Sequence, residues 1–138
     1  MTEVVATLVD SNVILDITSS DARWEQWSAG ALEQAAEAGA LVINPMIYAE
    51  VSARFPTIEE LDLALPAGTY FRESIPWPAA FLAGKAHLDY RRRGGTRRSP
   101  LPDFFIGAHA AVAGLRLLTR DPRRYHDYFP TVPLISPS

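Results

Sequence analysis

The sequence predicts an α/β fold, in which helices cover a mostly parallel central sheet of about four or five strands. Short apolar runs alternate with longer segments whose apolar residues recur every three or four positions. Strands that alternate with helices in this way are typical of crossover units and parallel sheets. The chain has 138 residues, of which 48% are hydrophobic. This size suits one core, so we expect a single domain over residues 1–138.

In the first half of the chain, each expected helix follows a residue that can cap it. Asn44 before Pro45 is a favoured order, because asparagine accepts amide hydrogen bonds and a first-turn proline needs no donor. Ser20, and either Ser11 or Asn12, precede helical patterns in the same manner. The elements expected here are, in order, a strand over residues 4–9, a short helix that begins near Val13, a helix from Ser20 to Gly39, a strand over 40–43 and a helix from Pro45.

The second half is expected to contain more helix than strand. Thr57 and Glu60 have the spacing of a capping box. Pro78 and Pro102 each stand at the head of an apolar helical stretch, and glycines follow both stretches. The elements expected here are, in order, a helix from Thr57, a strand within residues 68–75, helices from Pro78 and Pro102, and strands over 116–119 and 131–135.

The composition excludes several classes of function. There is no cysteine, which rules out disulfides, thiolate zinc sites and cysteine nucleophiles. No apolar run is long enough to span a membrane, and no glycine-rich phosphate-binding loop is present. The formal net charge of −3 argues against a generally basic surface for nucleic acid. Part of this charge comes from acids that a bound metal would offset, so the net charge does not exclude a nucleic-acid partner. We expect a soluble cytoplasmic protein with no membrane partner.

Four acidic residues stand where a carboxylate metal site would need them. Asp10 and Asp121 close two strand-like runs, and ligands bind at the carboxyl ends of strands in such sheets. Glu50 lies in a mostly apolar helix, and Asp103 lies in the first turn of another. Each also has an ordinary explanation, as a helix cap, a partner of the helix dipole or an exposed residue. Gathered together, carboxylates repel one another unless cations neutralise them, and hard divalent cations prefer such ligands.

The segments around these acids resemble the motifs of the PIN-domain ribonucleases. The four segments are residues 8–15 (LVDSNVIL), 48–51 (YAEV), 101–110 (LPDFFIGAHA) and 118–121 (LTRD), and they follow the order of the family. The resemblance covers nearly the whole chain and is closest to the VapC-type toxins of bacterial type II toxin–antitoxin pairs. It implies a three-layer α/β/α sandwich.

The resemblance also implies an activity and a set of partners. The activity is that of a metal-dependent endoribonuclease, a hydrolase that cleaves RNA phosphodiester bonds with Mg²⁺ or Mn²⁺. The implied partners are the RNA substrate, a cognate antitoxin that inserts a segment into the acidic groove, and a second copy of the chain in a homodimer. The implied catalytic residues and metal ligands are Asp10, Glu50, Asp103 and Asp121, with Asp10 and Asp103 as direct ligands.

Two further groups of residues are expected to assist. Ser11, Asn12 and Thr119 are expected to fix ligands or waters by hydrogen bonds, or else to serve as caps and turn residues. An arginine-rich segment before the third acid suits phosphate contact, because guanidinium groups bind phosphates in a bidentate manner; a solvated loop is the alternative. The arginines expected to contact RNA are Arg91, Arg92, Arg93, Arg97, Arg98 and Arg120. Three aromatic residues near the C-terminus are expected to be packing residues, with base stacking as the alternative: Tyr125, Tyr128 and Phe129.

Other functions fit parts of the same pattern. A housekeeping PIN-type RNA-processing nuclease would carry the same acids. A catalytically silent PIN-fold binding module would be expected to lose some of them, and here all four are retained. A phosphatase built on a similar sheet would need a second acid two residues after the first, where this chain has Asn12.

Overall fold

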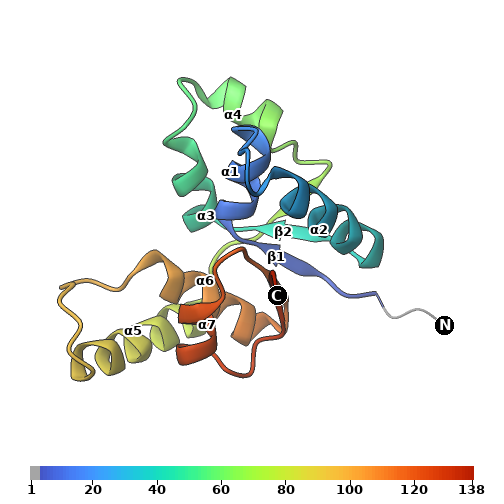
Figure 1. The fold of residues 1–138 in the computed structure, drawn as a ribbon. Helices are drawn as coiled ribbons and strands as arrows, with labels where there is room; N and C mark the ends of the chain where they lie inside the picture. The colour runs from blue at the N-terminus through green and yellow to red at the C-terminus, as the bar shows by residue number, and fades with distance from the viewer. Residues whose placement is uncertain (1–3) are drawn as a thin grey trace.

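The computed structural model describes residues 4–138, which form a five-stranded parallel sheet with helices on both faces (Figure 1). The strands are β1 (Thr7–Val9), β2 (Leu41–Ile43), β3 (Tyr70–Arg72), β4 (Arg116–Leu118) and β5 (Leu134–Ile135). They lie in the order β3-β2-β1-β4-β5, and every neighbouring pair is parallel. The predicted α/β fold with a parallel sheet is therefore confirmed. Residues 1–3 of the predicted domain lie outside the described part of the chain.

The helices form two layers. They are α1 (Ser11–Thr18), α2 (Glu25–Ala38), α3 (Pro45–Ser52), α4 (Ile58–Ala64), α5 (Trp77–Arg92), α6 (Pro102–Ala113) and α7 (Arg123–Tyr128). Figure 1 shows α1 to α4 on one side of the sheet and α5 to α7 on the other. Helix α3 contacts both α1 and α6, so it joins the two layers.

The strand order reverses between β1 and β4. From β1 the chain builds outward through β2 and β3, and it later returns to place β4 and β5 on the opposite side. Val9 pairs with Leu118, and the amide of Asp10 donates to the Leu118 carbonyl at 2.9 Å. The two central strands therefore end side by side at the same edge of the sheet. In open parallel sheets, ligands bind in the crevice at this switch point.

Several helices begin at the predicted capping residues. The side chain of Asn44 accepts the amide of Ile47, and the hydroxyl of Thr57 accepts the amide of Glu60. These caps are local in sequence, which explains why the pattern alone predicts them. The strands are shorter than the apolar runs that predicted them, since only residues 7–9 of the run over 4–9 pair with neighbours.

Two predicted helix starts are wrong. Helix α1 is capped by Asp10, which precedes both predicted caps, Ser11 and Asn12, because its carboxylate accepts the Ser11 amide at 2.8 Å. Helix α2 begins several residues after Ser20, which has a left-handed backbone with φ +53°. The carboxylate of Asp21 then accepts two following amides, and this turn delays the helix. Helix α7 is not among the predicted elements, and no side chain caps it.

The core lies between the sheet and the two helical layers. Both central strands are fully buried along their apolar positions, with Leu8, Val9, Leu117 and Leu118 inaccessible to solvent. Close packing of this kind holds the backbone in place, so the residues that follow β1 and β4 stand on a rigid base. Over residues 4–138, no helix combines the length and apolar character needed to cross a membrane.

Candidate active site

Asp10 lies at the switch point and is only 4% exposed. Its Oδ1 accepts the Ser11 amide at 2.8 Å, and its Oδ2 accepts the hydroxyls of Thr119 and Tyr125, both at 2.9 Å. Burial raises the pKa of Asp10 to about 6, and the charge of Asp103 adds to the rise, while the hydrogen bonds oppose it. Asp10 is thus a buried carboxylate with neutral donors around it.

Tyr125 connects Asp10 to Asp103. Its buried hydroxyl lies 2.9 Å from Asp10 Oδ2 and 3.4 Å from Asp103 Oδ1. One hydroxyl has one proton to donate, so the two carboxylates share it. The other oxygen of Asp103 lies 3.6 Å from Nη1 of Arg124. Burial raises the pKa of Asp103, and the charge of Asp121 adds to this rise.

Glu50 reaches the same cluster from α3. The hydroxyl of Ser11 donates to Glu50 Oε1 at 3.0 Å, so Ser11 contacts one acid with its amide and another with its side chain. Burial raises the pKa of Glu50, and the charges of Asp10 and Asp103 add to the rise. The half-buried carboxylate faces other acids, which does not fit the alternative of a residue on a solvated helix face.

Asp121 is exposed and opens with Asp103 onto a cavity of about 450 Å³. The cavity is lined by Tyr90, Asp103, Asp121, Arg123, Arg124, Asp127 and Tyr128. The four predicted acids therefore gather at one edge of the sheet. Three are connected through Ser11 and Tyr125, and the fourth shares the cavity with the third.

The donors in this cluster suit a hard divalent cation, since they are carboxylate and hydroxyl oxygens. Burial is the main cause of the raised pKa values of Asp10, Glu50 and Asp103, and the charges of neighbouring acids add to it. Within residues 4–138, no three acidic or histidine side chains stand as ligands around a common point. The carboxylates are instead directed to their hydrogen-bond donors, so holding an ion requires rotation of at least one side chain.

Asn12 and Thr119 join the ends of the two central strands. The Asn12 amide group lies 3.3 Å from the Thr119 hydroxyl and 3.5 Å from Asp10 Oδ2, and its Oδ1 accepts the Arg120 amide at 3.0 Å. The Thr119 hydroxyl also accepts the amide of Asp121 at 3.1 Å. Each residue expected to support the site thus contacts an acid or the backbone beside one. Their contribution to catalysis stays a prediction.

Five of the arginines expected to contact RNA are exposed. Arg91 and Arg92 end α5, and Arg93, Arg97 and Arg98 lie in the loop before α6. Tyr90 shapes this loop, because its hydroxyl accepts the amides of Thr96 and Arg97 at 3.2 and 3.3 Å. Contact of these arginines with RNA stays a prediction.

Arg120 has a partner within the fold. Its Nε and Nη2 donate to the two oxygens of Asp16 at 2.8 and 3.0 Å, and Asp16 also accepts the Ser28 hydroxyl at 2.7 Å. The guanidinium lies over the ring of Trp24 at 5.5 Å. A buried carboxylate requires such a partner, so the Arg120 side chain has a structural role beside the RNA contact predicted for it.

Tyr125 is the site residue that sequence reasoning missed. It was expected to pack in the core, and its ring does so. However, a buried tyrosine hydroxyl usually finds a polar partner, and here the partners are Asp10 and Asp103. The need of this hydroxyl for a partner was the available signal, but the sequence does not say which acid supplies it.

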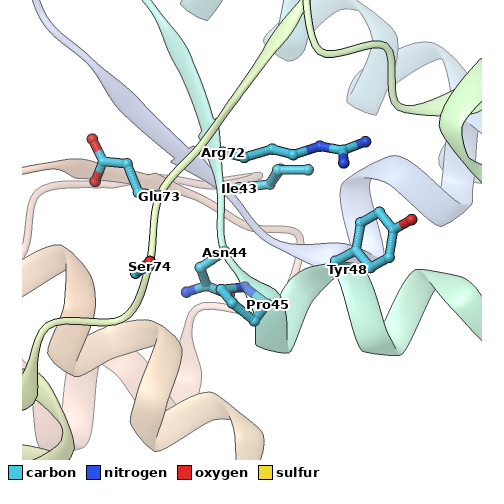
Figure 2. A pocket seen from close by; sticks show the side chains of 7 residues that line it. All are labelled: Ile43, Asn44, Pro45, Tyr48, Arg72, Glu73 and Ser74. Atoms are coloured by element: carbon cyan, nitrogen blue, oxygen red, sulfur yellow. The ribbon is translucent and has the colours of Figure 1, made fainter.

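A second cavity, of about 250 Å³, lies at the ends of β2 and β3 and contains none of the four acids. Figure 2 shows Arg72 beside Tyr48 on one side of β3, with Glu73 directed to the other side. The charged groups here already have partners, since Arg72 pairs with Asp62 at 2.9 Å and Glu73 with His109 at 3.2 Å. The lining residues are Ile43, Asn44, Pro45, Tyr48, Arg72, Glu73 and Ser74. We therefore assign the candidate site to the acidic edge.

Known proteins resemble this chain in sequence profile and in fold. The sequence profile of the PIN domain matches residues 7–128. The fold is similar to that of the promoter-bound VapBC2 complex of Rickettsia felis (15% identity, TM-score 0.72, covering 95% of this chain and 98% of the other). It is also similar to VapBC-1 of nontypeable Haemophilus influenzae (15% identity, TM-score 0.71, covering 95% of this chain and 97% of the other). A toxin–antitoxin complex of Klebsiella pneumoniae is similar as well (23% identity, TM-score 0.67, covering 96% of this chain and 98% of the other). No curated protein sequence matches significantly.

Proposed function

Since this chain belongs to the PIN-domain family, we propose that it is a metal-dependent endoribonuclease and the toxin of a toxin–antitoxin pair. The observation that carries the proposal is the gathering of four acids at the switch point, where three of them have raised pKa values. A fold that concentrates negative charge in this way is suited to hold a divalent cation against a phosphodiester. Its place of action would be the cytoplasm, where the RNA substrate lies.

Each residue of the site has a role in this proposal. Asp10 and Asp103 would hold the ion directly, and Glu50 and Asp121 would complete the site directly, through water or at a second ion. A divalent cation, when bound, lowers the pKa of a water ligand and offsets negative charge on the phosphate. No side chain of the protein then needs to act as the nucleophile.

The neighbouring hydrogen bonds would orient the acids. The Ser11 amide fixes one oxygen of Asp10, and Thr119 and Tyr125 fix the other. Ser11 also restrains Glu50, so the two acids are positioned together. Restraints of this kind commonly account for about 10–100-fold in the metal affinity or activity of metal sites.

The direct test is incubation of the purified protein with total RNA and with a defined single-stranded RNA, in Mg²⁺, in Mn²⁺ and in EDTA, followed by mapping of the cleaved ends. Internal cleavage that requires the ion and is lost in Asp103→Asn is the expected result. Full cleavage in EDTA would contradict the metal dependence. No cleavage under any condition would support the silent binding module instead.

We also propose that the antitoxin places an arginine or lysine among the acids. The support is Arg124, whose guanidinium lies 3.6 Å from Asp103, so one of the four acids already has a cationic side chain beside it. Expression of the chain alone should arrest growth, and Asp103→Ala should abolish the arrest at an unchanged level of protein. Harmless expression of a protein that cleaves RNA in vitro would favour a housekeeping nuclease.

The proposed homodimer has a candidate surface on α5. Trp77 is 88% exposed and Phe81, one turn later, is 69% exposed, and adjacent exposed aromatics often mark contact surfaces. Light scattering after size-exclusion chromatography should give the mass of two chains. The mass should fall toward one chain in Trp77→Ser, whereas a monomeric wild-type protein would contradict the dimer.

A further inference from the structure

The cavity beside Asp103 and Asp121 contains cations and aromatic rings as well as acids. Arg123 and Arg124 line it from the start of α7, and Tyr90 and Tyr128 line it from the ends of α5 and α7. Its volume of about 450 Å³ falls within the range of about 300–1,000 Å³ typical of small-ligand sites. A space with acids, arginines and tyrosines together has the groups needed to hold one nucleotide.

The two arginines are placed to bind a phosphate. Arg123 is exposed and forms no salt bridge within residues 4–138. The 3.6 Å between Arg124 and Asp103 is longer than the roughly 2.7–2.9 Å of a charge-assisted hydrogen bond, so this guanidinium retains donors for a ligand. Asp103, Asp121 and Asp127 would repel a phosphate, but the first two are proposed cation ligands whose charge an ion would offset.

The two tyrosine rings are held rigidly at the wall of the cavity. Both pack against Phe104, with ring centroids 5.7 Å away for Tyr90 and 5.0 Å away for Tyr128. The guanidinium of Arg93, which is half exposed, lies 4.7 Å above the Tyr128 ring. Arg93 also pairs with Asp89 at 2.9 Å, so a base that stacks on Tyr128 displaces the guanidinium from the ring face.

We propose that this cavity is a nucleotide subsite, in which Arg123 and Arg124 bind a phosphate and Tyr128, with Tyr90, stacks on the adjoining base. The choice of RNA as ligand rests on the proposed nuclease function. Stacking requires a base that is not paired, so the substrate class is single-stranded RNA and not duplex. Because every base has a ring face, this subsite favours unpaired RNA without specifying its sequence.

The test measures binding without cleavage. A fluorescein-labelled single-stranded RNA is titrated with Ca²⁺ in place of Mg²⁺, so that an ion can offset the charge of Asp103 and Asp121, against wild-type protein, Tyr128→Leu and Tyr128→Phe. Binding is followed by fluorescence anisotropy, and a gel verifies that the RNA stays uncut. Tyr128→Leu should bind roughly tenfold more weakly, and Tyr128→Phe should bind like wild type because it keeps the ring. Tyr48→Leu is the matched control, since Arg72 lies over the Tyr48 ring at 5.0 Å but that ring faces the other cavity.

The phosphate contact has its own readout. Arg123→Gln should reduce the slope of log affinity against log salt by about 0.7, the value for one phosphate contact on a single strand. Arg54→Gln, which removes another exposed arginine, should leave the slope unchanged. Thermal melting of each variant verifies that it is folded.

Crosslinking keeps the test independent of the substitutions. An RNA that carries 5-iodouridine should crosslink on irradiation to a peptide containing Tyr90 or Tyr128. The subsite would be overturned if the crosslinks fell on other peptides and if Tyr128→Leu bound RNA as tightly as its control, Tyr48→Leu. Metal-dependent cleavage with unchanged RNA affinity in Tyr128→Leu would refute the subsite alone, whereas RNA that binds here but is never cut would refute the nuclease alone.

Discussion

Helix α1 has a buried aspartate near each end, and the two have different partners. Asp10 at its start is 4% exposed, and Asp16 near its end is 3% exposed. Asp16 receives two bonds from the guanidinium of Arg120 and one from Ser28. Asp10 accepts the Ser11 amide and the hydroxyls of Thr119 and Tyr125 at 2.8–2.9 Å, with longer contacts of 3.5 Å from the Ser11 hydroxyl and the Asn12 amide group. No cationic side chain forms a salt bridge with it among residues 4–138.

This difference separates a carboxylate that is paired with a cation within the fold from one that is not. A buried charge is costly unless it is paired, and the fold pairs Asp16 from within. Around Asp10 the fold supplies orientation but no positive charge, and the pKa of Asp10 is raised to about 6. A carboxylate that is held in place but not neutralised is suited to a cation from outside.

The largest expected effect is a difference in RNA cleavage between variants of the two aspartates. Asp10→Asn keeps the shape of the side chain but removes a charge from the proposed cation site, so RNA cleavage in Mg²⁺ should fall by about 100-fold or more. Asp16→Asn, assayed at the same concentration of folded protein, should retain most of the cleavage rate. Equal losses of cleavage rate in the two variants would show that the two aspartates do not differ in role.

The second prediction concerns pH and the ion-free protein. The pKa of Asp10 is about 6 when folded and about 3.8 as a free side chain, so between these values the folded state binds a proton that the unfolded state lacks. The free energy of unfolding should therefore decrease as pH rises from about 4 to 6, by an amount on the order of 2–3 kcal/mol. Urea melts in EDTA across this range measure the effect.

A control variant tests whether this pH dependence comes from Asp10. Asp10→Asn should lose that part of the pH dependence and should melt at a higher temperature than wild type near pH 7.5 in EDTA, because the repelling charge is gone. A lower melting temperature would show that the charge of Asp10 is compensated after all.

The third prediction is a loss of stability in the opposite variant. Asp16→Asn leaves the Arg120 guanidinium without its carboxylate, which should lower the free energy of unfolding by on the order of 2 kcal/mol. This is less than the roughly 3–5 kcal/mol of a fully buried pair, since Arg120 is 31% exposed. Urea melts at pH 7.5 measure it, and the double variant with Arg120→Gln tests whether the two effects are coupled.

The smallest effect is expected at the shared hydroxyl. Tyr125→Phe removes the donor common to Asp10 and Asp103, so Mg²⁺ affinity measured by calorimetry should change by about tenfold. The fold should persist because the ring remains. Unchanged Mg²⁺ affinity would show that the hydroxyl makes hydrogen bonds to the carboxylates without affecting how they hold the ion.

The sequence predicted the four acids but not the groups that distinguish them. Caps such as Asn44 are local, and the acids lie in motifs whose order is recognisable along the chain. The pair of Asp16 and Arg120 spans 104 residues, and that of Asp10 and Tyr125 spans 115. Such partners meet because of the strand order, and a pattern of periodicity and capping contains no information about which distant side chains will meet.

The reversal of strand order between β1 and β4 also has an evolutionary consequence. The acids that would perform the chemistry are fixed to two buried central strands and to α3 and α6, whereas the arginine-rich residues 93–101 form an exposed loop outside the sheet. Such loops tolerate insertion and substitution far better than the elements they connect. A lineage can therefore change this loop without disturbing the elements that hold the four acids.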